Sequence, residues 1–553
     1  MNINGATIIL ETLKRLGVTD IFGYPGGAVI PIYDALYDFE GINHYLVRHE
    51  QGAAHAADGY ARTKNKVGVC IATSGPGATN LVTGIMTAQM DSIPILAITG
   101  QVSREALGRD SFQESDICGI TAPITKHNYL IKTIQELPKI IREAYFLSKN
   151  GRPGPVLIDI PNDVQTEKIT KEEFEKLWLS QKKILDKFKR KYIEKDIEIF
   201  RKMILESKKP IFILGGGILS SGATKTVKKL LEKLSAPSVS TLMGMGIVPS
   251  DFPGYMGMIG MHGIYDANRA VEESDLVVAI GMRFDNRIVG NKNSFAKNAK
   301  IIHLDIDEAE IGKNITPDFS IVGDAREILN KLLYLDLEVD FSSWKNSISK
   351  MQIKEECNLN QISVLNKINH IIDNNTIIVT DVGQHQMFAA QYLKFGKPYN
   401  FCSSSGAGTM GYGIPAAIGA QVANPDKKVI AIVGDGGFQM TQQELILLNQ
   451  YSLPIKVIIL NNSVLGMVRQ WQDLFHNKRF SQIDLSINPD FMKLADAYGI
   501  EGLKISDMSS LHLIEEAIKN SKPMVIEILV SKDFNVYPII PPGKIFEDTL
   551  KGA

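Results

Sequence analysis

Short apolar runs that end on small polar residues recur along the whole chain, separated by stretches with helical spacing of apolar positions. Strands that alternate with helices in this way are typical of parallel sheets covered on both faces. The pattern predicts an α/β fold. The expected strands are Val67–Thr73, Ile95–Thr99, Val156–Ile160, Ile211–Leu214, Leu276–Ile280, Ile301–Leu304, Ile377–Val379, Val429–Val433, Ile455–Leu460 and Val525–Leu529.

These runs fall into three groups, which predict three doubly wound parallel-sheet domains at residues 1–166, 190–335 and 358–535. Two charged stretches separate the groups, and we expect the first of them, 167–195, to be a linker. Residues 536–553 contain three prolines and are expected to form a tail or a lid. The first and third groups are similar in length and strand number, which is consistent with one ancestral unit used twice.

Composition excludes several classes of protein. The 553 residues suffice for three or four domains. A net charge of −1 gives no electrostatic footprint for nucleic acid. The four cysteines lie far apart and form neither a metal-ligand spacing nor a disulfide framework. No apolar run reaches the roughly 18 residues of a membrane span, and residues 5–16 predict an amphipathic helix rather than a leader. We expect a cytoplasmic protein, although a processed organellar form would look the same.

Two polar clusters mark the strongest candidate site. Gly434-Asp435-Gly436 follows the run 429–433, and Asn461-Asn462 follows the run 455–460. The carboxyl ends of parallel strands share one edge of a sheet, where ligands bind. Carboxylate and amide oxygens suit Mg²⁺, and glycines let the backbone approach a diphosphate closely. The pattern predicts a magnesium–diphosphate site.

Two candidates lie in the first group of strands. Glu50 precedes a helix rich in small residues (AAHAADGYAR), so it is expected to be partly desolvated and suited to proton exchange. An ordinary glutamate at a helix N-terminus is the commoner explanation for such a residue. The glycine-rich segment 74–80 follows a strand and is compatible with an anion site or with a tight turn.

The second group contains a weak dinucleotide pattern. Gly215-Gly216-Gly217 follows a strand, but Ser220 replaces the third glycine of the usual fingerprint. Residues 281–287 and 305–307 place arginines and acids after strands, which suits a phosphate and a ribose or, equally, a surface ion-pair network.

Two bulky residues near the polar clusters remain ambiguous. Met410 is the only long apolar side chain in a glycine-rich turn, and methionine is more often core filler than a ligand contact. Trp471 follows the Asn pair, where a packing role is the default.

Taken together and in this order, the segments resemble the thiamine-diphosphate enzymes that act on 2-keto acids, whose signature is GDG, about two dozen residues, then NN. Within that superfamily the chain is similar to the acetohydroxyacid synthases. The resemblance runs from residue 5 to beyond 470. Segments that carry it include YPGGAVIPIYDAL (24–36), HEQGAAHAADGYAR (49–62), TSGPGATN (73–80), GMRFDNR (281–287), DVGQHQM (381–387), GTMGYGIPAAIGA (408–420) and NNSVLGMVRQWQ (461–472).

The resemblance implies an activity: pyruvate is decarboxylated and its two-carbon unit is joined to a second 2-keto acid, pyruvate or 2-ketobutyrate, at the first common step of branched-chain amino acid biosynthesis. It implies thiamine diphosphate, Mg²⁺ and FAD as cofactors. The flavin is expected to be structural because the reaction is redox-neutral. It also implies a homodimer or homotetramer with active sites between subunits, and a separate small regulatory subunit.

The resemblance further implies roles for single residues. Glu50 should contact the aminopyrimidine ring, Met410 should bend the cofactor, and Arg287 and Trp471 should receive the second keto acid. Gly27, Gln113 and Lys126 should lie near the reacting carbon or the flavin. The expected Mg²⁺ ligands are Asp435, Asn462 and the Val464 carbonyl. The expected thiamine diphosphate contacts are Val382, Gly383, Gln384, His385, Gly408, Met410, Gly436 and Gly437. The expected FAD contacts are Gly216, Thr241, Leu242, Ile259, Gly260, Met261, His262, Gly281, Arg283, Asp285, Asp305 and Asp324.

Three positions depart from the family pattern: Asn286 replaces an aspartate beside Arg287, and Ser103 and Glu105 replace proline and arginine in many relatives. Two other functions remain open. A pyruvate oxidase would use the same cofactors and release peroxide, and a nucleotide-binding scaffold would have kept the fold without catalysis.

Overall fold

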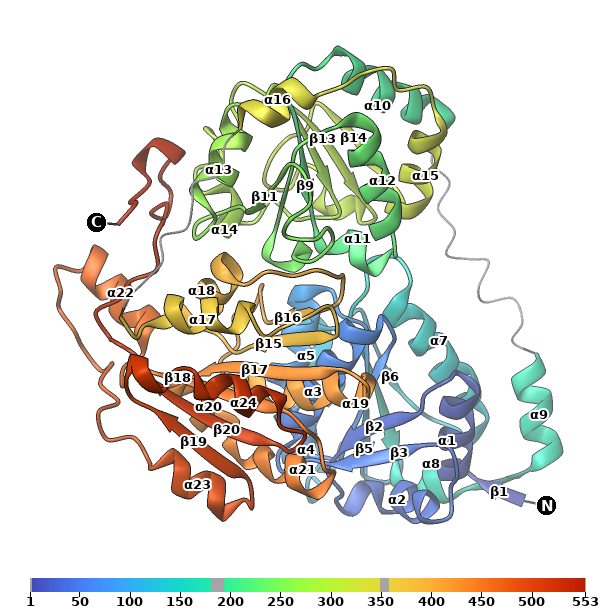
Figure 1. The fold of residues 1–553 in the computed structure, drawn as a ribbon. Coiled ribbons are helices and arrows are strands. Elements are labelled where there is room, and N and C mark those ends of the chain that lie inside the picture. Colours follow the sequence, from blue (N-terminus) through green and yellow to red (C-terminus); the bar gives the residue numbers. More distant parts are fainter. Residues whose placement is uncertain (1, 181–192, 349–357, 553) are drawn as a thin grey trace.

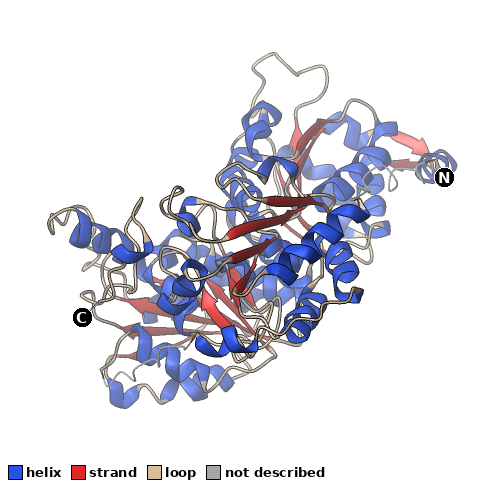
Figure 2. Cartoon of the chain, turned by 90° about the horizontal axis from the view of Figure 1, so that it is seen from above, coloured by secondary structure: helices blue, strands red, loops and turns tan. Residues whose placement is uncertain are grey.

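The computed structural model describes residues 2–180, 193–348 and 358–552, and within these ranges it contains three six-stranded parallel sheets (Figure 1). Helices flank the strands, as the view from above shows (Figure 2). The α/β prediction with three parallel sheets is therefore confirmed. Every predicted strand is present, and the ends of each strand lie within two residues of the predicted ends.

The first sheet has the strand order β3-β2-β4-β5-β7-β6. Its strands are β2 (Asp20–Gly23), β3 (Asn43–Leu46), β4 (Gly68–Ala72), β5 (Ile95–Gln101), β6 (His127–Leu130) and β7 (Val156–Pro161). Its helices are α1 (Gly5–Arg15), α2 (Ile30–Tyr37), α3 (Glu50–Lys64), α4 (Pro76–Asn80), α5 (Val82–Asp91), α6 (Ile117–Thr121), α7 (Leu137–Lys149) and α8 (Asn162–Thr166).

The middle sheet has the order β11-β10-β9-β12-β13-β14, which reverses on either side of β9. Its strands are β9 (Pro210–Leu214), β10 (Ser238–Ser240), β11 (Tyr255–Met258), β12 (Leu276–Ile280), β13 (Lys300–Asp305) and β14 (Phe319–Val322). Its helices are α10 (Glu194–Glu206), α11 (Gly216–Ser220), α12 (Thr224–Leu234), α13 (Tyr265–Glu272), α14 (Asn286–Val289), α15 (Ala325–Tyr334) and α16 (Ser342–Ser347).

The third sheet has the order β16-β15-β17-β18-β20-β19. Its strands are β15 (Thr376–Thr380), β16 (Phe401–Ser403), β17 (Lys428–Gly434), β18 (Lys456–Asn461), β19 (Glu501–Ile505) and β20 (Met524–Leu529). Its helices are α17 (Gln361–Asn369), α18 (Gln384–Tyr392), α19 (Gly413–Ala423), α20 (Asp435–Thr441), α21 (Leu445–Gln450), α22 (Gly466–Phe475), α23 (Phe491–Ala497) and α24 (Leu513–Lys519).

The first and third sheets share one topology. Numbered by appearance within each sheet, both have the strand order 2-1-3-4-6-5. Helix α3 connects the second and third strands of the first sheet, and α19 makes the same connection in the third. This equivalence supports the interpretation that one ancestral unit is used twice.

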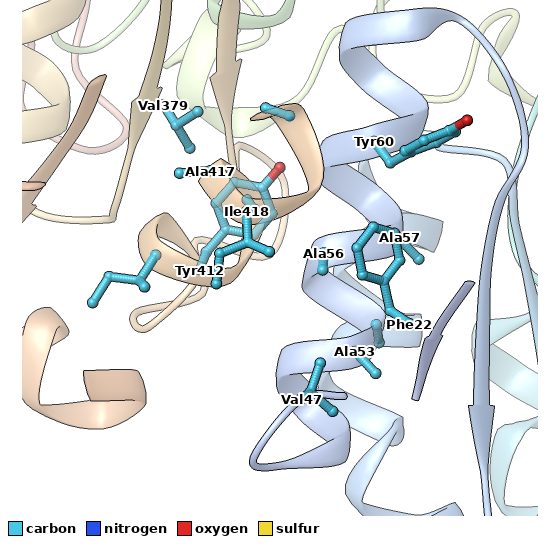
Figure 3. Close-up of a cluster of buried hydrophobic side chains, with 14 of the residues drawn as sticks. Phe22, Val47, Ala53, Ala56, Ala57, Tyr60, Val379, Tyr412, Ala417 and Ile418 are labelled. Atoms are coloured by element: carbon cyan, nitrogen blue, oxygen red, sulfur yellow. The ribbon is translucent and has the colours of Figure 1, made fainter. Parts of the chain in front are cut away.

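These two equivalent helices cross in the core that joins the first and third domains (Figure 3). Each carries the pattern Ala-x-x-Gly, Ala56 to Gly59 in α3 and Ala416 to Gly419 in α19. A Cβ on Gly59 would lie less than 3.0 Å from the Ala416 carbonyl, and one on Gly419 less than 3.0 Å from the Ala56 carbonyl. The small residues predicted to let α3 pack closely therefore do so, against its counterpart.

The segment 167–195 is not a simple linker. Strand β8 (Lys168–Thr170) pairs antiparallel with β1 (Asn2–Asn4), and helix α9 (Lys171–Leu179) buries Phe174 in the core of the first domain. The sequence did not reveal the buried face of α9 because charged residues dominate this helix and few apolar positions mark the face. Residues 181–192 of the expected linker lie outside the described part of the chain.

The last segment lies on the middle domain (Figure 1). The Ile540 N–H donates to the Met261 carbonyl at 2.9 Å, and the ring of Phe546 lies 5.0 Å from that of Tyr265. This segment therefore contacts the loop after β11 and helix α13 of the middle domain, while Val536 at its start is buried in the core of the third domain. Across the described ranges, every helix is too short or too polar to cross a lipid bilayer.

Candidate active site

A cavity of about 1700 Å³ lies between the carboxyl edges of the middle and third sheets, with one wall from the first domain. Its volume exceeds the range of about 300–1,000 Å³ that is usual for a site with one small ligand. It therefore has room for more than one ligand.

The middle-sheet edge contains all the positions predicted to contact FAD. Asp305 is the last residue of β13, and the others follow strands of this sheet: Gly216 follows β9, Thr241 follows β10, Ile259 follows β11, Gly281 follows β12 and Asp324 follows β14. All twelve except Gly260 line the cavity. Gly260 has a φ of +111°, and a Cβ there would lie less than 3.0 Å from the Arg287 carbonyl, so it acts through close backbone packing.

The glycines after β9 pack closely against Gly281, at the end of β12, in the middle of this edge. The Gly217 N–H donates to the Gly281 carbonyl at 2.8 Å, and a Cβ on Gly215 or Gly217 would lie less than 3.0 Å from Gly281. This is the point at which the strand order reverses, the usual place for a ligand in an open α/β sheet. The missing third fingerprint glycine thus does not prevent a close approach of β9 and β12.

Charged residues along the same edge line the cavity and also form ion pairs with one another. Arg283 lies 3.7 Å from Asp285, and Arg152 of the first domain lies 3.1 Å from Asp307. Burial raises the pKa of Asp305 to about 6. His262 is buried, and its Nδ1 has no hydrogen-bond partner within the described part of the chain.

The third-sheet edge contains the predicted metal clamp. Strands β17 and β18 are neighbours, so Asp435, at the start of α20, lies beside the Asn461-Asn462 pair. Burial raises the pKa of Asp435 to about 6. Asn488 donates from Nδ2 to the Asp435 carboxylate at 2.9 Å and to Asn461 Oδ1 at 3.3 Å. Asp435, Asn462 and Val464 all line the cavity.

The predicted metal ligands offer oxygen atoms only. No three His, Cys, Asp or Glu side chains of the described residues cluster closely enough to hold a metal ion alone. One carboxylate, one amide oxygen and one backbone carbonyl make a hard, oxygen-only set, which is what Mg²⁺ prefers when phosphates complete its shell.

Glycines and a histidine form a cradle beside the clamp. The His385 ring lies over Gly383 and Gly434, where a Cβ would lie about 3.0 Å from it. Burial lowers the pKa of His385 to about 4, and its Nε2 has no partner among the described residues. Gln384 donates to Gln470 at 2.9 Å, which fixes its side chain. The predicted diphosphate contacts all line the cavity here.

The turn that carries Met410 is fixed by Asp381. The Asp381 carboxylate accepts the Gly411 N–H at 3.0 Å and the Gly413 N–H at 2.8 Å. A Cβ on Gly436 would lie 3.5 Å from Met410 Cε, so Met410 reaches the clamp. Asp381 and Asn488 are site residues that the sequence pattern did not single out. The position of Asp381 directly after β15 was the available signal for it.

Arg287 and Trp471 meet across the domain boundary. The guanidinium carbon of Arg287, in α14, lies 5.7 Å from the centre of the Trp471 ring, in α22. Arg287 Nη1 lies 3.2 Å from the Met261 sulfur. Asn286, the departure beside Arg287, also lines the cavity. The arginine thus lines the cavity while it contacts an aromatic ring and a thioether sulfur.

Glu50, Gly27 and Gln113 lie outside this cavity and gather around the turn after β4. Glu50 is 8% exposed and accepts a hydrogen bond from Asn80 at 2.9 Å. Thr73 accepts the Ala28 N–H, next to Gly27, at 3.2 Å, and the backbone of Gln113 packs on Gly75. A single chain therefore holds two separate groups of predicted catalytic residues. Lys126 lines the cavity but is tied to the Asn150 carbonyl at 2.7 Å.

All three domains match families of known proteins. Residues 3–120, 197–332 and 381–528 match the N-terminal thiamine pyrophosphate (thiamine diphosphate) binding domain, the central domain and the C-terminal thiamine pyrophosphate binding domain of thiamine pyrophosphate enzymes. The acetolactate synthase large subunit of Lactococcus lactis is 47% identical, over 98% of this chain and 95% of its own. The probable acetolactate synthase large subunit of Methanocaldococcus jannaschii is 46% identical over 98% and 94%. The acetolactate synthase isozyme 2 large subunit of Escherichia coli is 42% identical over 99% and 100%.

The chain belongs to the acetolactate synthase large-subunit family.

Each of the two groups lies in a region that matches a thiamine pyrophosphate binding domain. The Glu50 group lies in the N-terminal binding domain and the Asp435 group in the C-terminal one. Of the other departures from the family pattern, Ser103 accepts the Ala106 N–H at 2.9 Å and Glu105 is exposed, so both lie at the surface of the first domain.

Proposed function

We propose that this chain is the catalytic subunit of an acetolactate synthase, which decarboxylates pyruvate and joins the two-carbon unit to a second 2-keto acid. The carrying observation is that the Asp435–Asn462 edge faces the cavity that contains the Arg287–Trp471 pair, in a chain with full-length similarity to acetolactate synthase large subunits. A metal clamp beside a carboxylate receptor is what ligation of two keto acids requires.

Thiamine diphosphate and Mg²⁺ fit the third-sheet edge. Asp435, Asn462 and the Val464 carbonyl would hold Mg²⁺, and the residues 382–385 with Gly408, Gly436 and Gly437 would hold the diphosphate. The unpartnered buried Nε2 of His385 and the glycine cradle support this assignment. When bound, thiamine diphosphate supplies the nucleophilic carbon and the electron sink for decarboxylation.

The residues of the chain would position the cofactor and the substrates and would hold a proton where the reaction needs one. Glu50 would hold a proton at the aminopyrimidine ring, since its carboxylate is buried and already accepts one neutral donor. Met410 would press the cofactor into a bent shape, a role that needs bulk rather than polarity. Arg287 would bind the acceptor carboxylate with its planar fork, and Trp471 would close the pocket behind it. Exclusion of water here protects the two-carbon unit from protonation.

FAD fits the middle-sheet edge. The close approach of Gly215–Gly217 to Gly281, the acids after β12 and β13, and the unpartnered Nδ1 of His262 support a bound dinucleotide. Because ligation of two keto acids is redox-neutral, the flavin would serve the structure of the cavity rather than electron transfer.

The separation of the two half-sites supports a homodimer or a dimer of dimers in which each active site uses two chains. Gly27 is exposed, and apolar side chains around its group face solvent in the single chain, among them Ile30 at 60% and Phe112 at 88% exposure. Such exposed apolar residues are typical of an interface. The relatives are named large subunits, which supports a separate small regulatory partner for this chain.

One assay decides between ligation and oxidation. The purified protein is incubated with pyruvate, thiamine diphosphate and Mg²⁺, and the products are measured before and after acid treatment. Acetolactate, detected as acetoin after acid, is expected; peroxide without acetoin would identify an oxidase. Glu50→Gln should abolish the product, whereas Glu172→Gln, at an exposed position of α9, should not. Activity that survives Glu50→Gln would refute the proposed proton relay.

A further inference from the structure

The glycine-rich turn before α19 is anchored from the first domain of the same chain. The Asp91 carboxylate, at the end of α5, accepts the Ser405 N–H at 2.9 Å and the Gly406 N–H at 2.6 Å. Asp91 and Gly406 are 315 positions apart in the sequence. The side chain of Asp91 is 1% exposed, so these bonds are shielded from water.

Arg62 neutralises Asp91 and reaches the same turn. Its Nη2 lies 2.7 Å from Asp91 Oδ2, and its Nη1 donates to the Ser403 carbonyl at 2.9 Å. Arg62 also pairs with Asp58, at 2.5 Å. A buried charge pair that is fully hydrogen-bonded is strongly destabilised by loss of one partner, because the other charge remains buried. Asp58, Arg62 and Asp91 therefore depend on one another, and together we call them the anchor of the turn.

Two more contacts from the first domain hold the turn on either side of Met410. Thr87 Oγ1, in α5, lies 2.7 Å from Thr409 Oγ1. The Tyr412 hydroxyl donates to Asp58 at 2.6 Å. Residues 409 and 412 are thus fixed by the first domain, whereas Asp381 of the third domain fixes 411 and 413.

The turn does not define its own shape. Gly408 has a φ of +61° and Gly411 a φ of +84°, and glycine populates such conformations without a steric penalty that would select one of them. The position of Met410 therefore depends on what holds the flanking residues. Helix α5 of the first domain contacts residues 405, 406 and 409, whereas Asp381 and Thr441 of the third domain hold Gly411 from the other side.

We propose that Asp91, supported by Thr87, is a positioning residue that holds Met410 at the diphosphate edge from a different domain of the same chain. The inference rests on the proposed function, in which Met410 shapes the bound cofactor. Asp91 lies in the wall of the cavity, and it acts on Met410 through the backbone of Ser405 and Gly406. A displacement of about 1 Å at such a contact can cost up to about a hundredfold in rate.

Asp91→Asn tests the anchor because it keeps the shape and removes the charge and one pair of acceptor lone pairs. Asp275→Asn is the matched control. Asp275 accepts two consecutive backbone N–H groups, of Lys208 at 2.8 Å and Lys209 at 2.9 Å, but it lies in the middle domain away from the turn. Thr87→Val provides a second variant that removes the Thr409 contact together with the bond to the Thr83 carbonyl within α5, and Thr87→Ser should restore both.

Two readouts are measured. Hydrogen exchange of residues 403–413 in the protein without cofactors should become about tenfold faster in Asp91→Asn and stay unchanged in Asp275→Asn. With cofactors, kcat should fall at least about tenfold while KM for pyruvate stays within about twofold. Thr87→Val should show the same pattern more weakly, and Thr87→Ser should behave as the native protein.

The outcomes separate this inference from the proposed function. Native protein that makes no acetolactate contradicts the function. Exchange is independent of turnover, so unchanged exchange of residues 403–413 in both Asp91→Asn and Thr87→Val contradicts the anchor. Faster exchange with unchanged kcat would show that the turn is anchored but that its position does not matter for catalysis, which also overturns the proposal.

Discussion

Gly59 of α3 and Gly419 of α19 occupy equivalent places on two crossing helices, and each faces a backbone carbonyl of the other helix. The carbonyls belong to Ala416 and Ala56, three residues before each glycine in its own helix. The crossing is therefore symmetric about a local two-fold axis, although the two helices come from one chain. Only glycine fits at either place.

Gly59→Ala should destabilise the protein. In an open helix, replacing glycine by alanine stabilises by about 0.5–1 kcal/mol, so the sign of the change reports the crossing. Here the added methyl group meets backbone, which cannot move away as a side chain can, and we expect a loss of about 1–3 kcal/mol. Urea unfolding of Gly59→Ala and Gly419→Ala measures it; a gain of stability in either variant would contradict the packing.

Glu444→Gln should make stability less dependent on pH. Glu444 is fully buried against the start of α3, accepts the Arg48 N–H at 3.1 Å, and burial raises its pKa to about 7 from 4.5. The folded state thus binds this proton more tightly than the unfolded state, so the stability it contributes is complete below 4.5 and lost as pH rises to about 7. The full shift corresponds to about 3 kcal/mol.

The measurement compares unfolding of both proteins at about pH 5 and about pH 8. Glu444→Gln should gain stability relative to the native protein at the higher pH, and the exposed Glu172→Gln should track the native protein at both. Equal differences at the two pH values would mean that the Glu444 carboxyl does not titrate in this window.

Asn488→Ala should weaken Mg²⁺ binding without removing a ligand. Its amide orients Asp435 and Asn461, and partners that orient metal ligands typically contribute 10- to 100-fold in affinity. Mg²⁺ titration, followed by protein fluorescence in the presence of thiamine diphosphate, measures the shift. Asn449→Ala is the control, because that amide donates to the Tyr498 carbonyl, away from the clamp. Equal Mg²⁺ affinity in the two variants would remove Asn488 from the site.

Arg287→Lys should impair use of the acceptor more than decarboxylation. Lysine keeps the charge but loses the planar fork and the contact with the Trp471 ring, 5.7 Å away. A loss of about 1.4 kcal/mol would lower apparent acceptor affinity tenfold. Supplying pyruvate and 2-ketobutyrate together and quantifying both ligation products and released acetaldehyde tests this. Arg104→Lys, on the surface, should leave the product distribution unchanged.

The apolar runs predict the centres of the sheets better than their edges. In the third sheet, β15, β17, β18 and β20 were all predicted, whereas the edge strands β16 and β19 were not. An inner strand of a parallel sheet is covered on both faces and is apolar throughout, but an edge strand such as Glu501–Ile505 is half exposed and shows no continuous run.

The candidate site divides in a similar way. Asp435 and Asn462 were predictable because a strand end and a ligand type identify a sheet edge locally. Asp91 and Asn488 were not, because each acts by binding groups far away in the sequence, whereas Asp381 lies directly after β15 and offered the same kind of signal as Asp435. Only the packing of the sheets brings Asp91 to Gly406, and no local pattern contains that information.

Helix α3 contacts both groups of site residues: the Glu50 group at its start and the turn that carries Met410 farther along. Glu50 is its first residue, and Asp58 and Arg62 hold the Met410 turn two to three helical turns later. Its 15 residues span roughly 22 Å as one rigid rod. In a homodimer with shared active sites, this rod would connect two neighbouring reaction centres, so ordering of one would be transmitted mechanically to the other without any loop or hinge between them.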